Sequence, residues 1–88
     1  MGEYRRLTAS YDDIADVLYL AVALPSFGVR YLGDEIGFLV RVGENGEPVG
    51  ITVEDFHYLW DGRLEVLVEA VADRLKVSPS DVREHLPT

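Results

Sequence analysis

The spacing of the apolar residues changes once along this chain. In residues 36–42 and 49–53 the apolar side chains alternate with other residues, whereas after residue 61 they recur at intervals of three and four. Alternation places neighbouring side chains on opposite faces of a strand, and the longer interval places them on one side of a helix. Strands first and helices last predict an α+β fold, in which a small antiparallel sheet of three or four strands is covered on one face by C-terminal helices.

The sheet is expected to be formed by residues 4–54. The two alternating segments, 36–42 and 49–53, are connected through Asn45-Gly46, a pair that tolerates positive φ in a tight turn. This arrangement predicts a β-hairpin. Looser alternation predicts a strand from Tyr4 to Tyr11. The unbroken apolar run 17–24 predicts a central strand covered on both faces.

Two connections complete the predicted sheet. The aspartates of residues 12–16 predict a turn, because an Asp side chain accepts hydrogen bonds from nearby backbone amides. Residues 29–32 are expected to add a short strand, since they lie between the punctuating glycines Gly28 and Gly33.

Two helices are expected in residues 61–86. The first has an apolar stripe at i, i+3, i+4, i+7 and i+11, with Asp61 as its N-cap. The second begins at Ser78 as N-cap with Pro79 as the first helical residue, and it ends at Pro87. The stripe would pack on the inner face of the sheet in one domain spanning residues 1–88. The predicted stripe consists of Leu64, Leu67, Val68, Val71 and Leu75.

Charge and composition exclude several classes of protein. Eight Lys and Arg against sixteen Asp and Glu give a net charge of −8, which disfavours binding to nucleic acid or to an anionic membrane. The absence of cysteine excludes a disulfide-stabilised secreted miniprotein. No apolar run approaches the roughly 20 residues that span a membrane, so a cytoplasmic location is expected.

The first 54 residues resemble a known family. The motifs are Ser10-Tyr11-Asp12, then Ala15-Asp16-Val17-Leu18-Tyr19-Leu20, then Asn45-Gly46 and Val49-Gly50-Ile51. Over about residues 4–54 they resemble the YuzE-like family of small bacterial domains of unknown function. The resemblance implies a small α+β sheet domain and implies no activity. Thr52 stands where family members often carry an acidic residue, and residues 56–88 extend beyond the short members.

The acidic clusters of the chain are candidate metal ligands, and an enzyme with a carboxylate-bound metal is one alternative function. Asp12, Asp13 and Asp16, together with Asp34 and Glu35, could supply oxygen atoms to Mg²⁺ or Ca²⁺. The spacing of a calcium-binding loop is missing, and the alternative is that Asp12 and Asp16 cap a turn. The second interpretation is favoured, so no metal and no cofactor are expected.

Catalysis by a nucleophile has little support in the sequence. There is no cysteine and no Gly-x-Ser-x-Gly motif, and His57 and His85 are the only imidazole bases. His57 lies in an aromatic segment, and His85 lies near a helix C-terminus, where a cation is stabilised. The protein is therefore expected not to be an enzyme.

The two predicted helices resemble a helix-turn-helix. In that alternative the protein is a DNA-binding regulator, in which Arg74, Lys76, Ser80 and Arg83 meet DNA. The second helix carries acidic residues, no third helix follows, and the chain is acidic. Two packed helices without a DNA partner are the favoured interpretation.

Two surfaces are candidates for protein contacts. The outer side of the predicted sheet would carry aromatic, Leu and Arg side chains beside small residues, a mixture found in protein interfaces. The leading prediction is a non-enzymatic protein-interaction module that acts as a neutralising or regulatory partner of a basic protein or forms a homodimer. The candidate residues are Tyr4, Tyr19, Ala21, Ala23, Leu39 and Arg41 on the sheet, and Phe56, Tyr58 and Trp60 in the aromatic segment.

Overall fold

The computed structural model describes residues 6–22, 30–44 and 46–87. They form an antiparallel sheet of five strands and three helices, which confirms the α+β prediction with more strands than expected. The predictions for Tyr4, Ala23 and Asn45 fall outside the described residues. The elements are β1 (Thr8–Asp12), β2 (Val17–Ala21), β3 (Arg30–Gly33), β4 (Leu39–Val42), β5 (Pro48–Glu54), α1 (Phe56–Trp60), α2 (Leu64–Leu75) and α3 (Pro79–His85).

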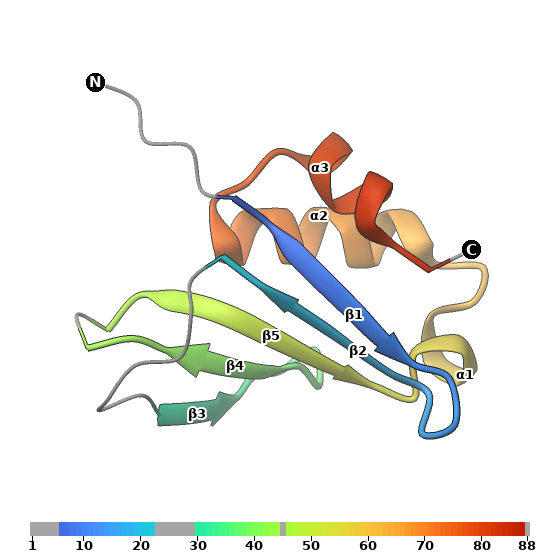
Figure 1. Ribbon diagram of the computed structural model, residues 1–88. Helices are drawn as coiled ribbons and strands as arrows, with labels where there is room; N and C mark the ends of the chain where they lie inside the picture. The colour runs from blue at the N-terminus through green and yellow to red at the C-terminus, as the bar shows by residue number, and fades with distance from the viewer. Residues whose placement is uncertain (1–5, 23–29, 45, 88) are drawn as a thin grey trace.

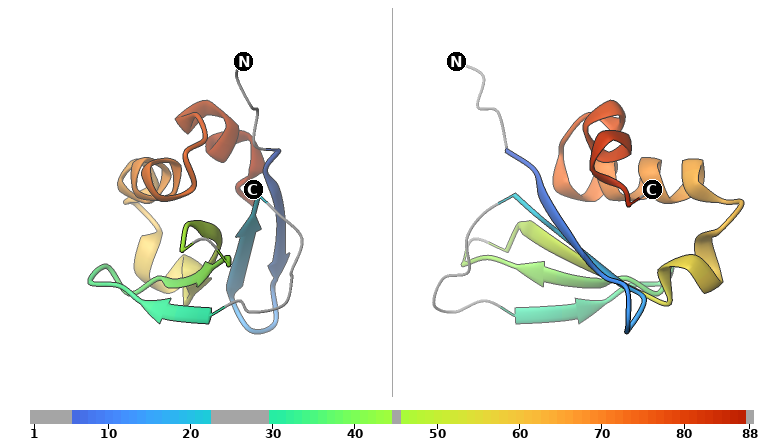
Figure 2. Two further views of the ribbon diagram at one scale, coloured as in Figure 1. Left: turned by 90° about the vertical axis from the view of Figure 1, so that its left-hand side faces the viewer. Right: turned by 45° about the vertical axis from the view of Figure 1, so that its right-hand side comes forward.

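The strands lie in the order β1-β2-β5-β4-β3, with β2 and β5 at the centre and β1 and β3 at the two edges (Figure 1). Every neighbouring pair is antiparallel. In the central pair, Leu20 lies opposite Ile51 and Leu18 lies opposite Val53. The helices α2 and α3 lie on one side of the sheet (Figure 2). The opposite side carries none of the helices formed by the described residues.

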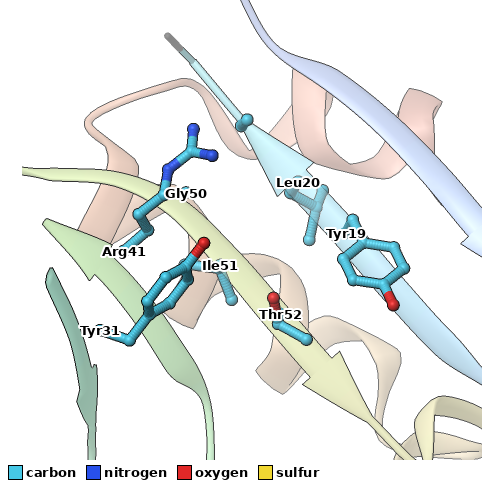
Figure 3. Close-up of a pocket in the computed structure, with 8 residues that line it drawn as sticks. Tyr19, Leu20, Tyr31, Arg41, Gly50, Ile51 and Thr52 are labelled. Atoms are coloured by element: carbon cyan, nitrogen blue, oxygen red, sulfur yellow. The ribbon is translucent and has the colours of Figure 1, made fainter. Parts of the chain in front are cut away.

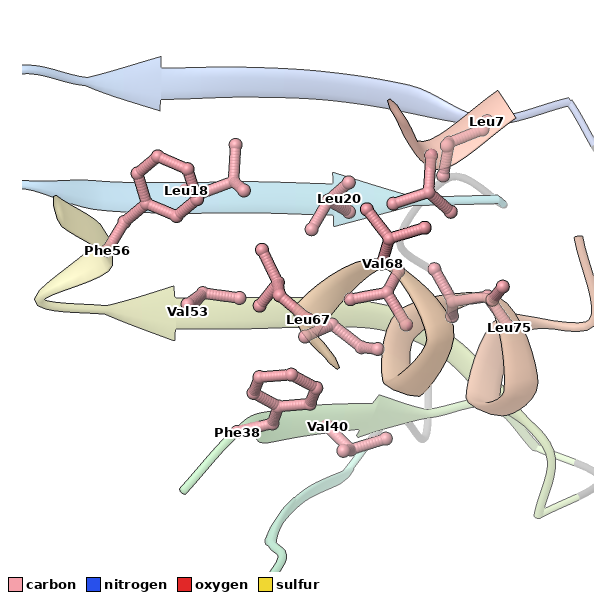
Figure 4. Packing of buried hydrophobic residues seen from close by; sticks show 14 of the residues in the cluster. Leu7, Leu18, Leu20, Phe38, Val40, Val53, Phe56, Leu67, Val68 and Leu75 are labelled. Atoms are coloured by element: carbon pink, nitrogen blue, oxygen red, sulfur yellow. The ribbon is translucent and has the colours of Figure 1, made fainter. Parts of the chain in front are cut away.

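The core lies between the sheet and α2 (Figure 4). The buried apolar side chains of β2 and β5 occur at every second residue, and they face the apolar stripe of α2. Each fully buried aliphatic side chain contributes roughly 1.5–3 kcal/mol of stability. Leu64 belongs to the predicted stripe but lies partly exposed at the first position of the helix. The residues of α2 without exposed area are Leu67, Val68, Val71 and Leu75.

The prediction that β2 is covered on both faces is wrong. Leu18 and Leu20 are buried, but Tyr19 between them is 45% exposed. The apolar run 17–24 made both faces look alike, although the described residues supply a helical layer on one face only. Tyrosine tolerates this position because its hydroxyl group can reach water while its ring rests on the sheet.

The β4–β5 hairpin is confirmed, with a longer connection than a two-residue turn. Gly46 has a φ of 84° and its amide donates to the Gly43 carbonyl at 3.0 Å. The Gly43 amide donates to the Glu47 carbonyl at 2.9 Å, and the strand register shifts between Arg41 and Val42. The positive φ at Gly46 is the conformation that glycine adopts without strain.

The helix ends agree only in part with the prediction. The Ser78 hydroxyl accepts a hydrogen bond from the Asp81 amide at 3.2 Å, so the N-cap of α3 is confirmed. Asp61 is not the N-cap of α2. It follows α1, a helix that the sequence patterns did not predict, and Arg63 precedes α2 without a side-chain cap. The α2 helix ends at Lys76, which has a left-handed φ of 59°.

Candidate functional site

The helix-free side of the sheet gathers most of the residues predicted for an interface. Directly paired residues of antiparallel strands project from the same face. The pairings place Tyr31, Arg41, Gly50 and Ala21 in one row across the sheet, and Leu39, Thr52 and Tyr19 in the next row. We call this surface the outer face and define it by Tyr19, Ala21, Tyr31, Leu39, Arg41 and Thr52.

Large apolar side chains stand exposed on the outer face. Tyr31 is 57% exposed and Leu39 is 39% exposed, beside Tyr19. Sequence reasoning identified Tyr19, Leu39 and their neighbours on β2 and β4, but it missed Tyr31 and Thr52. Tyr31 could not be assigned to a face because the register of the short strand β3 was unknown, whereas the alternation in β5 already indicated the side of Thr52.

The outer face contains a small hollow of about 150 Å³ between Tyr19, Tyr31 and Arg41 (Figure 3). Its floor includes Gly50, and a Cβ atom there would lie 3.3 Å from both Arg41 Nε and the Leu20 carbonyl oxygen. The absent side chain at Gly50 therefore lets the Arg41 side chain lie close to the sheet. The volume is below the roughly 300–1,000 Å³ of small-molecule sites. The hollow fits a single side chain of a partner.

One end of the outer face is acidic. Asp12 and Glu54 flank Val17 in the next row of the sheet, and Asp13 and Asp55 follow them in the chain. We call these four residues the acidic end. In the part of the chain that the structure describes, no three His, Asp or Glu side chains are grouped so that they could hold a metal ion.

The three aspartates predicted as alternative metal ligands have different positions. Asp12 caps the β1–β2 turn, because its Oδ1 accepts hydrogen bonds from the amides of Ile14 and Ala15 at 3.0 and 3.1 Å. Asp13 is exposed beside it. Asp16 interacts instead with α1. The turn-capping interpretation is therefore confirmed for Asp12, while Asp16 stabilises a different element.

Asp16 forms a cluster with Tyr11 and His57. Tyr11 donates its hydroxyl hydrogen to Asp16 Oδ1 at 2.6 Å, and His57 Nδ1 lies 2.8 Å from the same hydroxyl oxygen and 3.2 Å from Asp16 Oδ1. The Asp16 carboxylate also accepts hydrogen bonds from the His57 backbone amide at 2.9 Å and from the Tyr58 backbone amide at 3.3 Å. It thereby stabilises the first turn of α1 from a distant part of the chain.

The electrostatics of the cluster follow from these bonds. The hydrogen bond from Tyr11, followed by that from the His57 amide, lowers the pKa of Asp16 from 3.8 to about 2. The same Tyr11–Asp16 hydrogen bond is the main reason that the pKa of Tyr11 rises from 10.0 to about 12. At neutral pH the Asp16 carboxylate is ionised and the Tyr11 hydroxyl is neutral. The cluster joins the β1–β2 turn to α1.

The prediction that Phe56 and Trp60 belong to an exposed aromatic interface is wrong. They are only 2% and 4% exposed, whereas Tyr58 between them is 84% exposed. The cause is α1, whose i and i+4 positions lie on the same side and face the core. The Trp60 ring packs against the Phe38 ring, with the two ring centroids 5.7 Å apart. Tyr58 is the only one of the three that is available to a partner.

The cations of the helix pair form bonds within the molecule. Arg74 Nε lies 2.6 Å from Asp34 Oδ2 in a largely buried ion pair, and the Arg74 guanidinium lies over the Phe38 ring at 5.4 Å. Arg83 donates two hydrogen bonds to the Glu65 carboxylate at 2.9 and 3.0 Å. Two of the four residues predicted to meet DNA in the alternative interpretation therefore hold the helices in place.

The remaining two residues of that alternative lie near the junction of α2 and α3. The Val77 amide donates to the Ala72 carbonyl at 3.2 Å, which closes α2 in the Schellman pattern with Lys76 in the left-handed conformation. Ser80 is exposed in the first turn of α3, and its hydroxyl lies 3.4 Å from that of Ser78. The junction is a tight connection between two packed helices.

A comparison of the chain with protein-family models, with curated proteins and with solved structures finds no match. The resemblance to the YuzE-like family stays a prediction from the motifs. Of the helices in the described residues, none combines the length and the apolar character needed to cross a membrane.

Proposed function

We propose that this protein is a non-enzymatic interaction module whose outer face binds a basic segment of a partner protein. The observation that carries the proposal is the exposure of Tyr19, Tyr31 and Leu39 on a sheet face without a helical layer. Aromatic side chains and Arg41 are the residue types that concentrate binding energy in protein interfaces. A cytoplasmic role as a neutralising or regulatory partner of a basic protein fits the absence of cysteine.

The dimensions of the outer face favour a segment over a whole domain. The three inter-strand spacings from β2 to β3 make it roughly 14 Å wide, and a five-residue strand makes it roughly 17 Å long. The resulting area of roughly 240 Å² is less than half of the ~800 Å² that each partner contributes to a standard interface. An extended segment that inserts one side chain into the hollow matches this size.

The charges of the surface favour a basic segment. The acidic end adjoins Tyr19, and the whole chain carries a net charge of −8. Carboxylates pair with Lys or Arg, and the faces of tyrosine rings attract the same cations. Arg41 lies toward the other half of the outer face, so the partner's cation would bind at the acidic end.

The structure offers less support for the two alternatives. A DNA-binding regulator would need Arg74 and Arg83 at base edges or phosphates, yet both form ion pairs with Asp34 and Glu65. An enzyme with a carboxylate-bound metal would need converging oxygen ligands, yet the Asp12 and Asp16 carboxylates accept backbone amides in two different places. The interaction module is therefore the function that we propose.

The test starts with partners captured from the native host. The double variant Tyr19→Thr/Leu39→Thr replaces the apolar groups with residues that suit exposed strands. Val66→Thr, at an exposed apolar residue of α2, is the matched control outside the outer face. We expect a basic protein that binds the wild type and the control, and that loses at least about tenfold in affinity for the double variant in a titration of the purified proteins. Equal binding by all three proteins would refute the outer face as the docking surface.

A further inference from the structure

The outer edge of β1 has no partner strand among the described residues. The strand pairs with β2 on one side, and no described strand pairs with it on the other. Figure 2 shows β1 at the border of the sheet, opposite the β3 edge. An open edge presents backbone N–H and C=O groups that can form a ladder with another strand.

The backbone groups on this edge can be identified. The Val22 amide donates to the Val49 carbonyl at 2.9 Å, so the even-numbered residues of β2 bond to β5 and the odd-numbered ones bond to β1. The pairing of Ser10 with Tyr19 then makes the even-numbered residues of β1 the ones that bond to β2. Ala9 and Tyr11 therefore direct their N–H and C=O groups outward.

We propose that the β1 edges of two copies of this chain pair antiparallel about a two-fold axis at Ala9, so that one sheet runs through both copies. In this register Ala9 lies opposite the partner's Ala9, and Leu7 lies opposite the partner's Tyr11. The odd-numbered residues on each side then exchange hydrogen bonds in the regular antiparallel pattern. The dimer uses the edge of the sheet and leaves the outer face available, and of the acidic end it uses only Asp12, so it goes beyond the proposed function.

We call the paired β1 strands of the two copies the seam. The side chains on both faces of the seam are self-complementary. On the helix-free side, Arg6 lies opposite the partner's Asp12, and Thr8 lies opposite the partner's Ser10. Opposite charges placed directly across two strands stabilise their pairing. On the helical side, small Ala9 meets its own copy, and the apolar Leu7 meets an aromatic ring. The seam therefore continues both the polar and the apolar face of the sheet.

The two charged groups are available for this contact. Arg6 is exposed and forms no ion pair with a described residue. Asp12 is exposed as well, and its Oδ1 holds the turn amides. A carboxylate accepts several hydrogen bonds, so Oδ2 can accept the guanidinium of the second copy.

The register and the choice of edge follow from the same charges. A shift of the seam by two residues in either direction moves Arg6 away from the partner's Asp12, so only the two-fold at Ala9 forms the ion pairs. The β3 edge offers no equivalent, because β3 has one cation, Arg30, and no acidic residue. Asp34, which follows β3, is already paired with Arg74.

The test measures self-association of the full chain by sedimentation over a wide range of concentrations. Ala9→Pro removes the central outward amide of the seam, and a proline on an edge strand keeps the ladder on the other side. Tyr31→Pro is the matched control, because the pairing of Leu32 with Val40 directs the Tyr31 amide outward at the β3 edge. We expect dimers for the wild type and for Tyr31→Pro, and folded monomers for Ala9→Pro by circular dichroism.

Two variants of Arg6, one that reverses the charge and one that keeps it, test the register. Arg6→Glu places two like charges opposite each other at both ends of the seam, and we expect the dimer dissociation constant to rise at least about tenfold. Arg6→Lys preserves the charge and keeps the dimer. A wild type that stays monomeric at millimolar concentration overturns the proposal. So does a dimer that survives Ala9→Pro.

The proposed dimer and the proposed function can be refuted independently of each other. The double variant Tyr19→Thr/Leu39→Thr leaves the β1 edge intact, so it should remain dimeric while it loses the basic partner. Loss of the dimer in that variant, with Ala9→Pro still dimeric, would place the self-contact on the outer face and refute the edge.

Discussion

The two faces of the central strands are built from alternating residues of the same segments, yet they have opposite environments. On the helical side Leu18, Leu20 and Ile51 are at most 2% exposed, whereas Tyr19 on the other side is nearly half exposed. The difference arises because the last third of the chain supplies helices for one face only. Alternation along a strand thus indicates that two faces differ, and a second layer decides which face is buried.

The largest effect should come from the buried face. Leu67→Ala removes a fully buried side chain where α2 meets the sheet and leaves a cavity, so we expect a loss of about 2–5 kcal/mol in the free energy of unfolding. Chemical denaturation measures this loss. A cost below about 1 kcal/mol would show that the helix contributes little to the core and would remove the contrast between the faces.

The next effect concerns the helical side of the sheet, where Arg74 of α2 pairs with Asp34 after β3. Arg74→Met leaves the largely buried Asp34 carboxylate without its cation, and we expect a loss of about 1–3 kcal/mol at neutral pH. Burial by itself would raise the pKa of Asp34, but the hydrogen bonds from Arg74 and from the amides of Phe38 and Ile36 outweigh it and lower the pKa.

The sign of the pH dependence follows from that lowered pKa. The contribution of Asp34 is fully present above its ordinary pKa of 3.8, and it is lost as the pH falls through the lower pKa of the folded protein. Stability measured from pH 6 down to pH 2 should therefore fall less steeply in Arg74→Met than in the wild type. An equal slope in both proteins would contradict the role of this ion pair.

A smaller effect, of opposite sign, is expected at the end of α2. Lys76 has a left-handed φ of 59°, which costs a residue with a Cβ roughly 1–2 kcal/mol and costs glycine much less. Lys76→Gly should stabilise the protein by about 1 kcal/mol in thermal unfolding, with Lys76→Ala as the control that keeps the strain. Destabilisation by Lys76→Gly would show that the lysine side chain contributes to packing at this junction.

Removal of the Tyr11–Asp16 hydrogen bond should change the pKa of Asp16 more clearly than it changes the free energy of unfolding. Tyr11→Phe removes the largest cause of the lowered pKa of Asp16, so that pKa should rise from about 2 toward 3.8 in a carboxyl titration by NMR. The pKa of Asp34, which is lowered by Arg74 in a different part of the fold, provides the internal reference. An Asp16 pKa that stays near 2 would assign the shift to the backbone amides of α1.

The smallest effect is expected on the outer face. Tyr19→Thr exchanges a half-exposed ring for a β-branched residue that suits a strand, so the free energy of unfolding should change by less than about 1 kcal/mol. Chemical denaturation of Tyr19→Thr and Leu67→Ala under the same conditions compares the two faces directly. A loss as large as that of Leu67→Ala would mean that the ring supports the sheet, and it would weaken the docking proposal.

The patterns in the sequence predicted the elements with strong periodicity. The β4–β5 hairpin, the buried stripe of α2 and the Ser78 cap of α3 depend on residues close together in the chain, and all three are confirmed. The five-residue helix α1 is too short for a period to be recognised, so Phe56 and Trp60 were assigned to the surface.

The candidate site was predictable only where strand alternation decides it. Tyr19 and Leu39 were placed on the helix-free side because successive residues of a strand point to opposite faces, and the structure confirms the side. The Tyr11–Asp16–His57 cluster joins residues more than 40 positions apart, so no local pattern could reveal it. The ion pair between Asp34 and Arg74 is equally distant in sequence.

The capping of α1 by Asp16 has a consequence for damaged forms of this protein. A helix of five residues has no stability in isolation, because helix nucleation costs more than so few hydrogen bonds return. It therefore depends on the hydrogen bonds from its amides to the Asp16 carboxylate and on the packing of its aromatic side chains in the core. If the β1–β2 hairpin detaches, α1 unwinds and releases Phe56 and Trp60 into water, where chaperones and proteases recognise large aromatic groups as a sign of misfolding.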